Sequence, residues 1–498
     1  MLDISKLFSV PSETEAYRAN SRLNHVFQMI SLKRECSIND LWELIAHETV
    51  STRYDNREEL QRAIDWLLKR LVALNLVAFS EHMGSQMLPD SWQVVRMPKM
   101  IIALTKQDND KPTILVYGNL DVEEALPGDG WRTEPFVMSE KGGYMYGRGV
   151  AFDKGPLLCW LNAVQAYRKC DVQLPINLVF VVESMAHSGS LGLETVLQQR
   201  ISFFRRVDCV VMANRRWQSN LTPAAIYGGR GLVYYQLEVE CANRSLSSCE
   251  HAGSLYEALP DLIYLLSNLM DTELHLLFNT KAVASVANMS QTRNVEFKYR
   301  ELGANIEAPA LPYATQLQQA LICNWFEPHL SIHGIEGCSV ESDARFIIPH
   351  KVIGKFSISL APNQIAEEVT NILQHHLGTV WALRDSPNHM QLCEIISIPP
   401  WTANPQTPEY DAALSAMEHT YKMTPNLVRD GAALLAPSIF QRCLQKNVLV
   451  LPIAQHDYGG TPVDERLSIK NYIDGQSTHR CFSCGNTPSR CRKLQRIP

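Results

Sequence analysis

Short apolar runs alternate with stretches of helical periodicity between residues 113 and 217. Continuous apolar runs at Thr113–Gly118, Asn177–Glu183 and Cys209–Met212 predict three buried strands, and the spacing of apolar residues after about Leu157 predicts a helix between the first two. Strands that alternate with helices in this order are typical of a doubly wound α/β sheet. Ligands bind such sheets at the carboxyl ends of the strands, so we expect the functional residues there.

The flanking regions predict further elements of the same domain. Helices are expected at Ile38–Glu48, Arg57–Leu74 and Tyr410–Tyr421, and strands at Val95–Thr105 and Asn447–Pro452. The residues before Ile38 show only weak helical periodicity and are interpreted as a mobile extension.

A second domain is predicted after Gly228–Gly231, which we expect to interrupt the pattern. Beyond it, two strand-helix units are expected, a pattern typical of a small α+β domain: Leu232–Glu240 with Tyr256–Met270, and Val352–Leu360 with Ala366–His375. The predicted layout is an extension (1–37), a first domain in two parts (38–225 and 396–476), an inserted second domain (226–395) and a tail (477–498). A site is expected in the cleft between the two domains.

Composition limits the function classes. Of the 498 residues, 46% are hydrophobic and 20% are charged, with a formal net charge of −6, which is typical of a soluble globular protein without a basic surface for nucleic acid. No apolar run approaches the length of a membrane span, and Asp3 and Lys6 interrupt the first apolar stretch, so a signal peptide is not expected. We therefore expect a cytoplasmic protein with no membrane partner.

The chain has 13 cysteines, most of them scattered through predicted strands and helices, where a thiol acts as a small hydrophobe. The tail differs, because Cys481, Cys484 and Cys491 lie close to His479. These residues could form half of a zinc site or a redox pair. The interpretation that we favour is an unstructured tail with incidental cysteines.

Three motifs follow the predicted strands. They read Tyr-Gly-Asn-Leu-Asp-Val from Tyr117, Gly-Arg-Gly-Val-Ala-Phe-Asp-Lys-Gly-Pro from Gly147, and Glu-Ser-Met-Ala-His-Ser-Gly-Ser from Glu183. They resemble Tyr-Gly-His-Leu-Asp-Val, Gly-Arg-Gly-x-x-Asp-Asp-Lys-Gly-Pro and Glu-Gly-Met-Glu-Glu-Ser-Gly-Ser in di-zinc peptidases of the carnosinase and cytosolic non-specific dipeptidase type, a family that includes aminoacylase and carboxypeptidase-G-like enzymes. The resemblance extends from Ile38 to Gly475. It implies a zinc-peptidase-like α/β domain with an inserted ferredoxin-like lid that dimerises.

The resemblance also implies where metal should bind, and every one of those positions has changed. The family's His, bridging Asp, Glu, Asp and final His ligands correspond to Asn119, Phe152, His187, Asn214 and Thr461. The position of its catalytic Glu holds Ala186. Asp121, which in the family orients the first His, is retained, as is Asp153.

These changes predict the loss of the metal centre. Two zinc ions in one site need a bridging carboxylate, and each needs three or more good donors. Phenylalanine offers no lone pair, asparagine offers a weakly binding neutral carbonyl, and His187 alone does not hold zinc. We therefore expect no cofactor, and we interpret Asp121, Asp153 and His187 as residues left in a former metal cleft, with Asp153 and Lys154 able to form an ion pair.

The substrate positions that the resemblance implies have changed as well. Ser359 stands at the Arg that clamps the peptide carboxylate, Ser247 at a His that reaches across the dimer, Ile396 at another His and Ala433 at a Ser.

Three functional hypotheses follow. The main one is a catalytically inactive member of the dipeptidase-type family that acts by binding or as a partner subunit. The first alternative is an active metal-dependent dipeptidase with a rebuilt site that uses zinc or manganese and draws on His187, Asp121, Asp153 and either His456 or Asp457. The second alternative is a regulatory subunit that forms a heterodimer with an active relative through the lid; a homodimer through the same domain is also consistent with the sequence.

Overall fold

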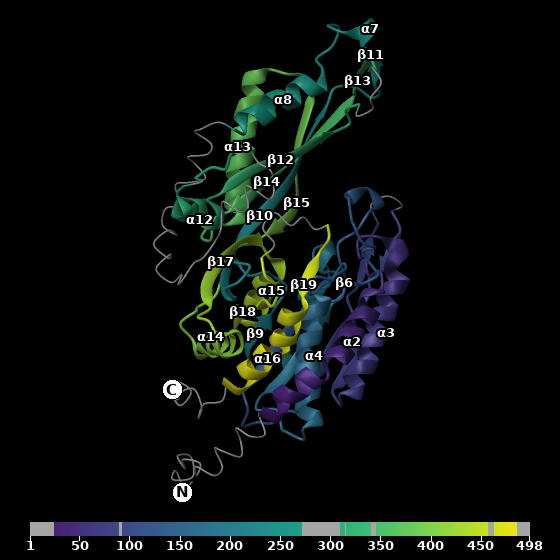
Figure 1. Ribbon diagram of the computed structural model, residues 1–498. Coiled ribbons are helices and arrows are strands. Elements are labelled where there is room, and N and C mark those ends of the chain that lie inside the picture. Colours follow the sequence, from purple (N-terminus) through teal and green to yellow (C-terminus); the bar gives the residue numbers. More distant parts are fainter. Residues whose placement is uncertain are drawn as a thin grey trace.

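The computed structural model describes residues 24–88, 92–270, 309–313, 315–339, 345–456 and 463–485. A larger body and an elongated lid are joined through one long strand, β10 (Ala224–Glu240), as Figure 1 shows. Within the described residues, no helix is long and apolar enough to cross a bilayer.

The body is organised around a mixed sheet in which β5, β8 and β9 run parallel to one another. Its strands are β1 (Val77–His82), β4 (Lys99–Leu104), β8 (Asn177–Glu183), β5 (Thr113–Asn119), β9 (Val207–Met212), β18 (Asn447–Val450) and β10 in that order, with β16 (Trp401–Thr402) and β17 (Asn426–Ala433) also paired to β10. Every residue of β5 and β8 is buried, as expected of parallel strands covered on both faces. The predicted α/β fold class is confirmed.

Helices and short strands surround this sheet. The helices are α2 (Arg34–Ile45), α3 (Arg57–Ala73), α4 (Lys154–Lys169), α5 (Leu193–Gln199), α6 (Ile201–Phe204), α12 (Leu317–Phe326), α14 (Pro408–Tyr421), α15 (Leu435–Leu444) and α16 (Ile469–Gly485), with 3-10 turns η2 (Tyr54–Asn56), η3 (Pro127–Asp129) and η4 (Ala186–Ser188). The short strands are β2 (Ser85–Met87), β3 (Val94–Arg96), β6 (Ser139–Lys141), β7 (Tyr144–Tyr146) and β19 (Arg466–Ser468). The strand predicted at Val95–Thr105 is divided into β3 and β4, because Pro98 cannot donate a ladder hydrogen bond.

The lid is a four-stranded antiparallel sheet in the order β15 (His389–Ile398), β10, β14 (Lys351–Leu360) and β12 (His329–Glu336). Helices α8 (Ala258–Asn268) and α13 (Ala366–Arg384) pack on it, and Figure 1 shows both on the same side of the sheet. The small elements β11 (Leu246–Ser247), α7 (Ser248–His251) and β13 (Ile347–Ile348) lie at its far end. Alternate strand residues such as Tyr235 and Phe356 form its apolar core.

The predicted interruption at Gly228–Gly231 is wrong, because β10 runs through these glycines from the body into the lid. They are required by close packing: a Cβ atom on Gly228 would lie 2.5 Å from the buried guanidinium of Arg429, and one on Gly231 would lie 2.6 Å from the carbonyl oxygen of Ile398. The glycines therefore mark the place where the strand crosses other backbone, not the end of an element.

Both ends of the described chain are more ordered than predicted. Helix α16 extends to Gly485, so the expectation of an unstructured tail from residue 477 is wrong for residues 477–485. The reason is packing on α4, where the His479 ring stacks on Trp160 at 4.2 Å between centroids. Residues 24–32, within the segment interpreted as a mobile extension, are helical, and Val26 and Ile30 pack against Tyr167. Cys491 lies outside the described residues.

The crossing of β10 gives a stability prediction. Gly231→Ala should lower the free energy of unfolding by about 1–3 kcal/mol, because the added methyl meets backbone that cannot move aside. Gly378→Ala in α13, where a Cβ would meet nothing within 4 Å, should raise it by about 0.5–1 kcal/mol. Chemical denaturation of both variants measures the difference, and equal changes would contradict this account of β10.

His479 gives a prediction about acid stability. Complete burial lowers the pKa of its imidazole from 6.5 to about 3. Between these pH values the unfolded chain binds a proton at His479 and the folded protein does not. The free energy of unfolding should therefore fall as the pH drops from about 6.5 towards 3, by up to about 1.4 kcal/mol per pH unit. In His479→Phe, which keeps the ring stack, urea denaturation at pH 4 to 7 should show a shallower fall; parallel curves would contradict the prediction.

Candidate active site

The carboxyl ends of three parallel strands meet at one edge of the body sheet. Asn119, the last residue of β5, is paired with Glu183, the last residue of β8, and Tyr117 in β5 is paired with Met212 at the end of β9. Asn214 follows β9 by two residues. The residues predicted to be functional on these strands are therefore neighbours, as the sheet topology requires.

Asn119 and Asp153 form the first part of this cluster. The Asn119 side chain donates from Nδ2 to the backbone oxygen of Asp121 at 2.8 Å, and its backbone N–H donates to Asp153 Oδ2 at 3.2 Å. Asp153 Oδ1 is buried and accepts no hydrogen bond from the described residues. Burial raises the pKa of the Asp153 carboxyl well above its usual value, which favours the neutral acid.

Asp121 connects two other segments. Its Oδ2 accepts hydrogen bonds from Ser51 Oγ at 2.7 Å and from the backbone N–H of His187 at 2.8 Å, and Ser51 Oγ is also 2.9 Å from Ser188 Oγ. The His187 imidazole stays partly accessible, with Nδ1 3.9 Å from Glu123 Oε1. Asp121 and His187, both predicted to lie in the cleft, are thus brought together, but through the backbone of His187 and not through its ring.

Glu183 is completely buried beside Asp121. Its Oε2 accepts hydrogen bonds from Tyr117 Oη at 2.7 Å and from Ser190 Oγ at 3.3 Å. Burial, with a smaller contribution from the Asp121 charge, raises the pKa of Glu183 to about 8, so the carboxyl is mostly protonated at neutral pH. Several acidic side chains can lie close together here because at least one of them, Glu183, is mostly protonated and therefore neutral.

Lys154 does not form the predicted ion pair with Asp153. Its Nζ donates to the backbone oxygens of Leu44 at 3.1 Å and His47 at 2.9 Å, in and just after the last turn of α2. Burial lowers the pKa of the Lys154 ammonium to about 7. The side chain therefore ties α4 to the end of α2.

Glu465 holds the loop before α4 in place. Its carboxylate accepts hydrogen bonds from the backbone N–H groups of Gly149 at 2.9 Å, Ala151 at 2.8 Å and Phe152 at 3.0 Å. Phe152 is thereby fixed at the end of β5, and the Arg216 guanidinium lies over its ring, 4.8 Å from the centroid. Sequence reasoning assigned no role to Glu465, Ser51 or Arg216, because a motif does not show which backbone groups or rings a side chain will meet.

The donors at this edge do not fit a two-metal centre. Phe152 has no donor atom, the Asn119 amide nitrogen is used on Asp121, and Ala186 offers only a methyl group. Asn214 Oδ1 is buried without a hydrogen-bond partner among the described residues, but it is a single neutral oxygen. Across the described ranges no three His, Cys, Asp or Glu residues group in a way that would hold a metal ion. Thr461 and Asp457 lie outside the described residues.

The remaining predicted positions are spread over the molecule. Ser359 lies in β14 opposite Leu232 and His329, Ile396 lies in β15, and Ser247 lies in β11 at the far end of the lid. Ala433 lies at the end of β17, paired with Arg230. His456, in the body, donates its backbone N–H to Ser219 O at 3.1 Å.

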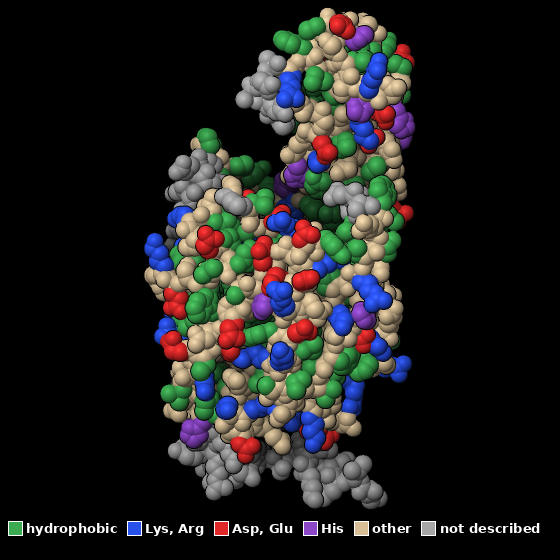
Figure 2. All heavy atoms as spheres, turned by 90° about the vertical axis from the view of Figure 1, so that its right-hand side faces the viewer, with side chains coloured by type: hydrophobic (Ala, Val, Ile, Leu, Met, Phe, Trp, Pro, Cys, Tyr) green, Lys and Arg blue, Asp and Glu red, His purple; other side chains and the backbone are tan. Residues whose placement is uncertain are grey.

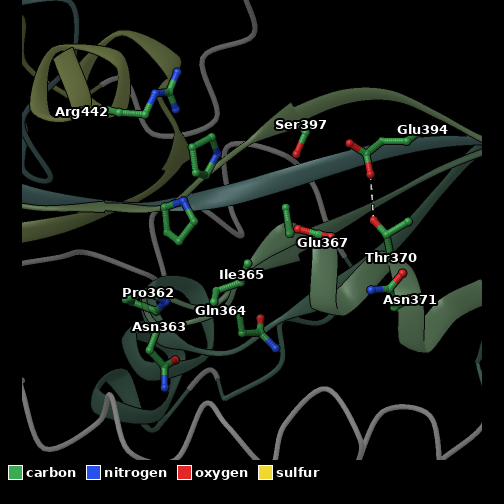
Figure 3. A pocket seen from close by; sticks show the side chains of 13 residues that line it. Pro362, Asn363, Gln364, Ile365, Glu367, Thr370, Asn371, Glu394, Ser397 and Arg442 are labelled. Atoms are coloured by element: carbon green, nitrogen blue, oxygen red, sulfur yellow. Dashed lines mark hydrogen bonds between the residues drawn. The ribbon is translucent and has the colours of Figure 1, made fainter.

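The surface is hollowed where the lid meets the body. Figure 2 shows this hollow, with acidic and basic side chains on the body below. A groove of about 660 Å³ lies at the base of the lid, where Figure 3 shows the start of α13, strand β15 and Arg442 of α15 around it. Thr370 donates to Glu394 across this groove at 2.8 Å. We refer to Asn119, Asp121, Asp153, Glu183 and His187 as the strand-end cluster. None of the residues that line the groove belongs to this cluster, so the groove is not the site predicted from the sequence.

Comparison with known proteins places the chain in a family. The model of peptidase family M20/M25/M40 matches residues 115–482, which is most of the chain and includes all three motifs. The chain belongs to this peptidase family.

Two relatives of known activity align with most of the chain. Beta-Ala-His dipeptidase of Homo sapiens is 33% identical over 483 residues, covering 96% of this chain and 94% of the relative. Cys-Gly metallodipeptidase DUG1 of Saccharomyces cerevisiae is 34% identical over 407 residues, covering 80% of this chain and 84% of the relative. The solved structure of the di-peptidase Dug1p from the same yeast superposes with a TM-score of 0.86 at 30% identity, over 94% of this chain and 99% of that one.

These relatives correct two expectations. The hypothesis of a catalytically inactive chain is wrong by this comparison, because relatives that match along most of the chain are named dipeptidases, and this favours the alternative of an active enzyme with a rebuilt site. The expectation of no cofactor conflicts with a relative named as a metallodipeptidase. The expectation of inactivity rested on single positions, whereas the similarity to named dipeptidases extends over most of the chain.

Glu183 gives a prediction for this site. The unfolded chain ionises Glu183 near pH 4.5 and the folded protein near pH 8, so the folded state binds more protons and the free energy of unfolding falls as the pH rises through this range. Glu183→Gln should remove that fall, so its stability relative to the wild type should increase from pH 5 to pH 8. Urea denaturation at several pH values measures it. Glu140→Gln on exposed β6 is the control; the same trend in both variants would refute the prediction.

Proposed function

We propose that this protein is a dipeptidase-type hydrolase that cleaves short peptides at the strand-end cluster, with a site rebuilt around residues other than the family's metal donors. The observation that carries the proposal is the alignment of named dipeptidases with most of the chain. Their names specify beta-Ala-His and Cys-Gly, both unblocked dipeptides, so we take short peptides with free ends as the substrate class.

Several described residues are suited to parts of this reaction. His187 is the accessible imidazole of the cluster, and a histidine can accept a proton from water and return it to a leaving amine near neutral pH. Burial raises the pKa of the Asp153 carboxyl, and its Oδ2 accepts the backbone N–H of Asn119, so Asp153 holds the end of β5 that borders the site. Asp121 fixes the backbone of His187 and so keeps its ring at the edge of the sheet.

Zinc or manganese remains part of the proposal only as an addition to be tested. The described donors do not form a two-metal site, so no step of the reaction is assigned to metal. His456 and Asp457 are the further donors that the rebuilt-site hypothesis named. The cytoplasmic location, and pairing through the lid as a homodimer or heterodimer, stay predictions.

Hydrolysis of a panel of dipeptides tests the proposal. The purified protein should cleave at least one dipeptide, and His187→Ala should lower kcat by about 10²–10⁴-fold, because that is the usual contribution of a general acid or base. Each assay is run on dialysed protein, after chelator treatment, and with added zinc or manganese, with the metal content measured on the same samples.

His251→Ala in α7, at a half-exposed position in the lid, is the matched control and should leave kcat unchanged. Absence of turnover for the whole panel under every metal condition would contradict the proposed hydrolase. Equal loss of activity in His187→Ala and His251→Ala would leave the hydrolase standing but remove His187 from the reaction.

A further inference from the structure

Two aromatic rings are stacked on the lid sheet. Tyr234 of β10 and His333 of β12 have their ring centroids 5.3 Å apart and their planes inclined by 6°. Strand β14 runs between them, and its residue opposite Tyr234 is Ser357. Because the side chain of Ser357 is small, the two rings can meet above it. Its Oγ lies 2.8 Å from His333 Nε2, and this hydrogen bond holds the imidazole in place.

The ring pair lies on the face of the sheet opposite α8 and α13. Those helices pack on the apolar core that contains Tyr235 and Phe356. Successive residues of a strand point to opposite faces, so Tyr234 and Ser357 point the other way. Ile396, which is paired with Tyr234 across β15, shares this face and is 44% exposed. The stacked rings therefore adjoin an exposed apolar side chain.

This part of the lid is close to the body. Tyr234 follows Gly231, where β10 passes the junction, by three residues, a rise of about 10 Å along the strand. Figure 1 shows the lid helices on the side of the sheet turned away from β6, so the face with the rings is turned towards the body. The surface is hollowed between lid and body, as Figure 2 shows. A ligand held in this hollow is thus within reach of the rings.

The chemistry of this face favours a ring over a charge as the group that is recognised. Both lysines that β14 places on the face are paired within the lid, Lys355 with Glu336 and Lys351 with Glu238, each at 2.6 Å. His333 is exposed and Tyr234 is half-buried. A parallel stack with centroids this far apart is offset, so part of each ring surface stays uncovered. A further aromatic ring can therefore extend the stack.

We propose that Tyr234 and His333 form a subsite that stacks an aromatic side chain of a short peptide bound between lid and body. The proposal rests on the proposed function and names the substrate class, peptides that carry a planar ring. The hydrogen bond from Ser357 fixes the imidazole before the ligand arrives, so little side-chain entropy is lost on binding.

Calorimetric titration tests the subsite without turnover. The probes are dipeptide analogues in which CH₂–NH replaces the peptide bond, with phenylalanine or cyclohexylalanine at the first or the second position and alanine at the other. Cyclohexylalanine has a similar apolar bulk but no π system. At one of the two positions the wild type should bind the phenylalanine form about two- to tenfold more tightly, as expected for one aromatic stack.

Variants of the two rings identify the source of this preference. Tyr234→Leu and His333→Leu should each reduce it, and Tyr234→Phe should retain it because the ring is kept. Tyr256→Leu is the matched control: this tyrosine is 62% exposed, precedes α8 in the same lid, and should have no effect. Thermal melting confirms that each variant is folded.

Each outcome supports or contradicts the subsite. No binding of any analogue, equal binding of the ring forms at both positions, or an undiminished preference in folded Tyr234→Leu would overturn it, while peptide hydrolysis could still be observed. An equal loss in Tyr256→Leu would also overturn it. A preference that depends on Tyr234 and His333 in a protein without turnover would support the subsite and contradict the proposed hydrolase.

Discussion

The geometry of the cleft depends on one continuous strand. The first half of β10 pairs with β17 and β16 in the body, and the second half pairs with β14 and β15 in the lid. Body and lid are therefore joined through backbone hydrogen bonds, which fix direction more strictly than contacts between side chains do. The crowding around Gly231 shows how closely the backbone segments approach at this junction.

The strand-end cluster keeps its acidic groups together by protonation. Burial raises the pKa of both Asp153 and Glu183, and that of Glu183 reaches about 8, so the Glu183 carboxyl is mostly protonated at neutral pH. Glu465 is stabilised differently, because three backbone N–H groups surround its carboxylate. Positive charge at this edge comes from guanidinium groups, among them Arg148, 3.6 Å from the Glu465 carboxylate, and Arg216, over the Phe152 ring. A protonated acid, a hydrogen-bonded carboxylate and guanidinium groups together make a polar site of a different kind from one built on metal donors.

Much of the architecture could be predicted from the sequence, because the relevant signals are local. The apolar runs of β5 and β8 and the periodicity of α3 identify these elements within one or two residues. The predicted interruption at Gly228–Gly231 was wrong because local composition does not distinguish a glycine needed for a turn from one needed for close packing. The helical order of residues 477–485 was missed for a similar reason, since it depends on Trp160, more than 300 positions earlier.

The candidate site was predictable only in part. Motifs identified Asp121, Asp153 and His187, and the parallel strands bring them to one edge as expected. The motifs carry no information about which atoms meet, so the backbone bond from His187 to Asp121 and the turn of Lys154 towards α2 could not be foreseen. Glu465 comes from a distant part of the sequence and joins the site only through the fold. The prediction of an inactive chain was wrong because it considered only the metal-ligand positions and not the similarity of the whole chain to named dipeptidases.

The layout of the body has a consequence for biosynthesis. Its core joins α2 near the start of the chain to α16 near residue 485, whereas the lid lies between them in sequence. A ribosome releases the strands and helices of the lid before it releases β18 and α16, so the lid can fold while the body still lacks part of its sheet and a covering helix. During that interval the edge of β9 that later receives β18 is exposed, and unpaired strand edges promote association with other chains. A nascent chain of this fold is therefore most in need of chaperone protection late in translation, when its inserted domain is already complete.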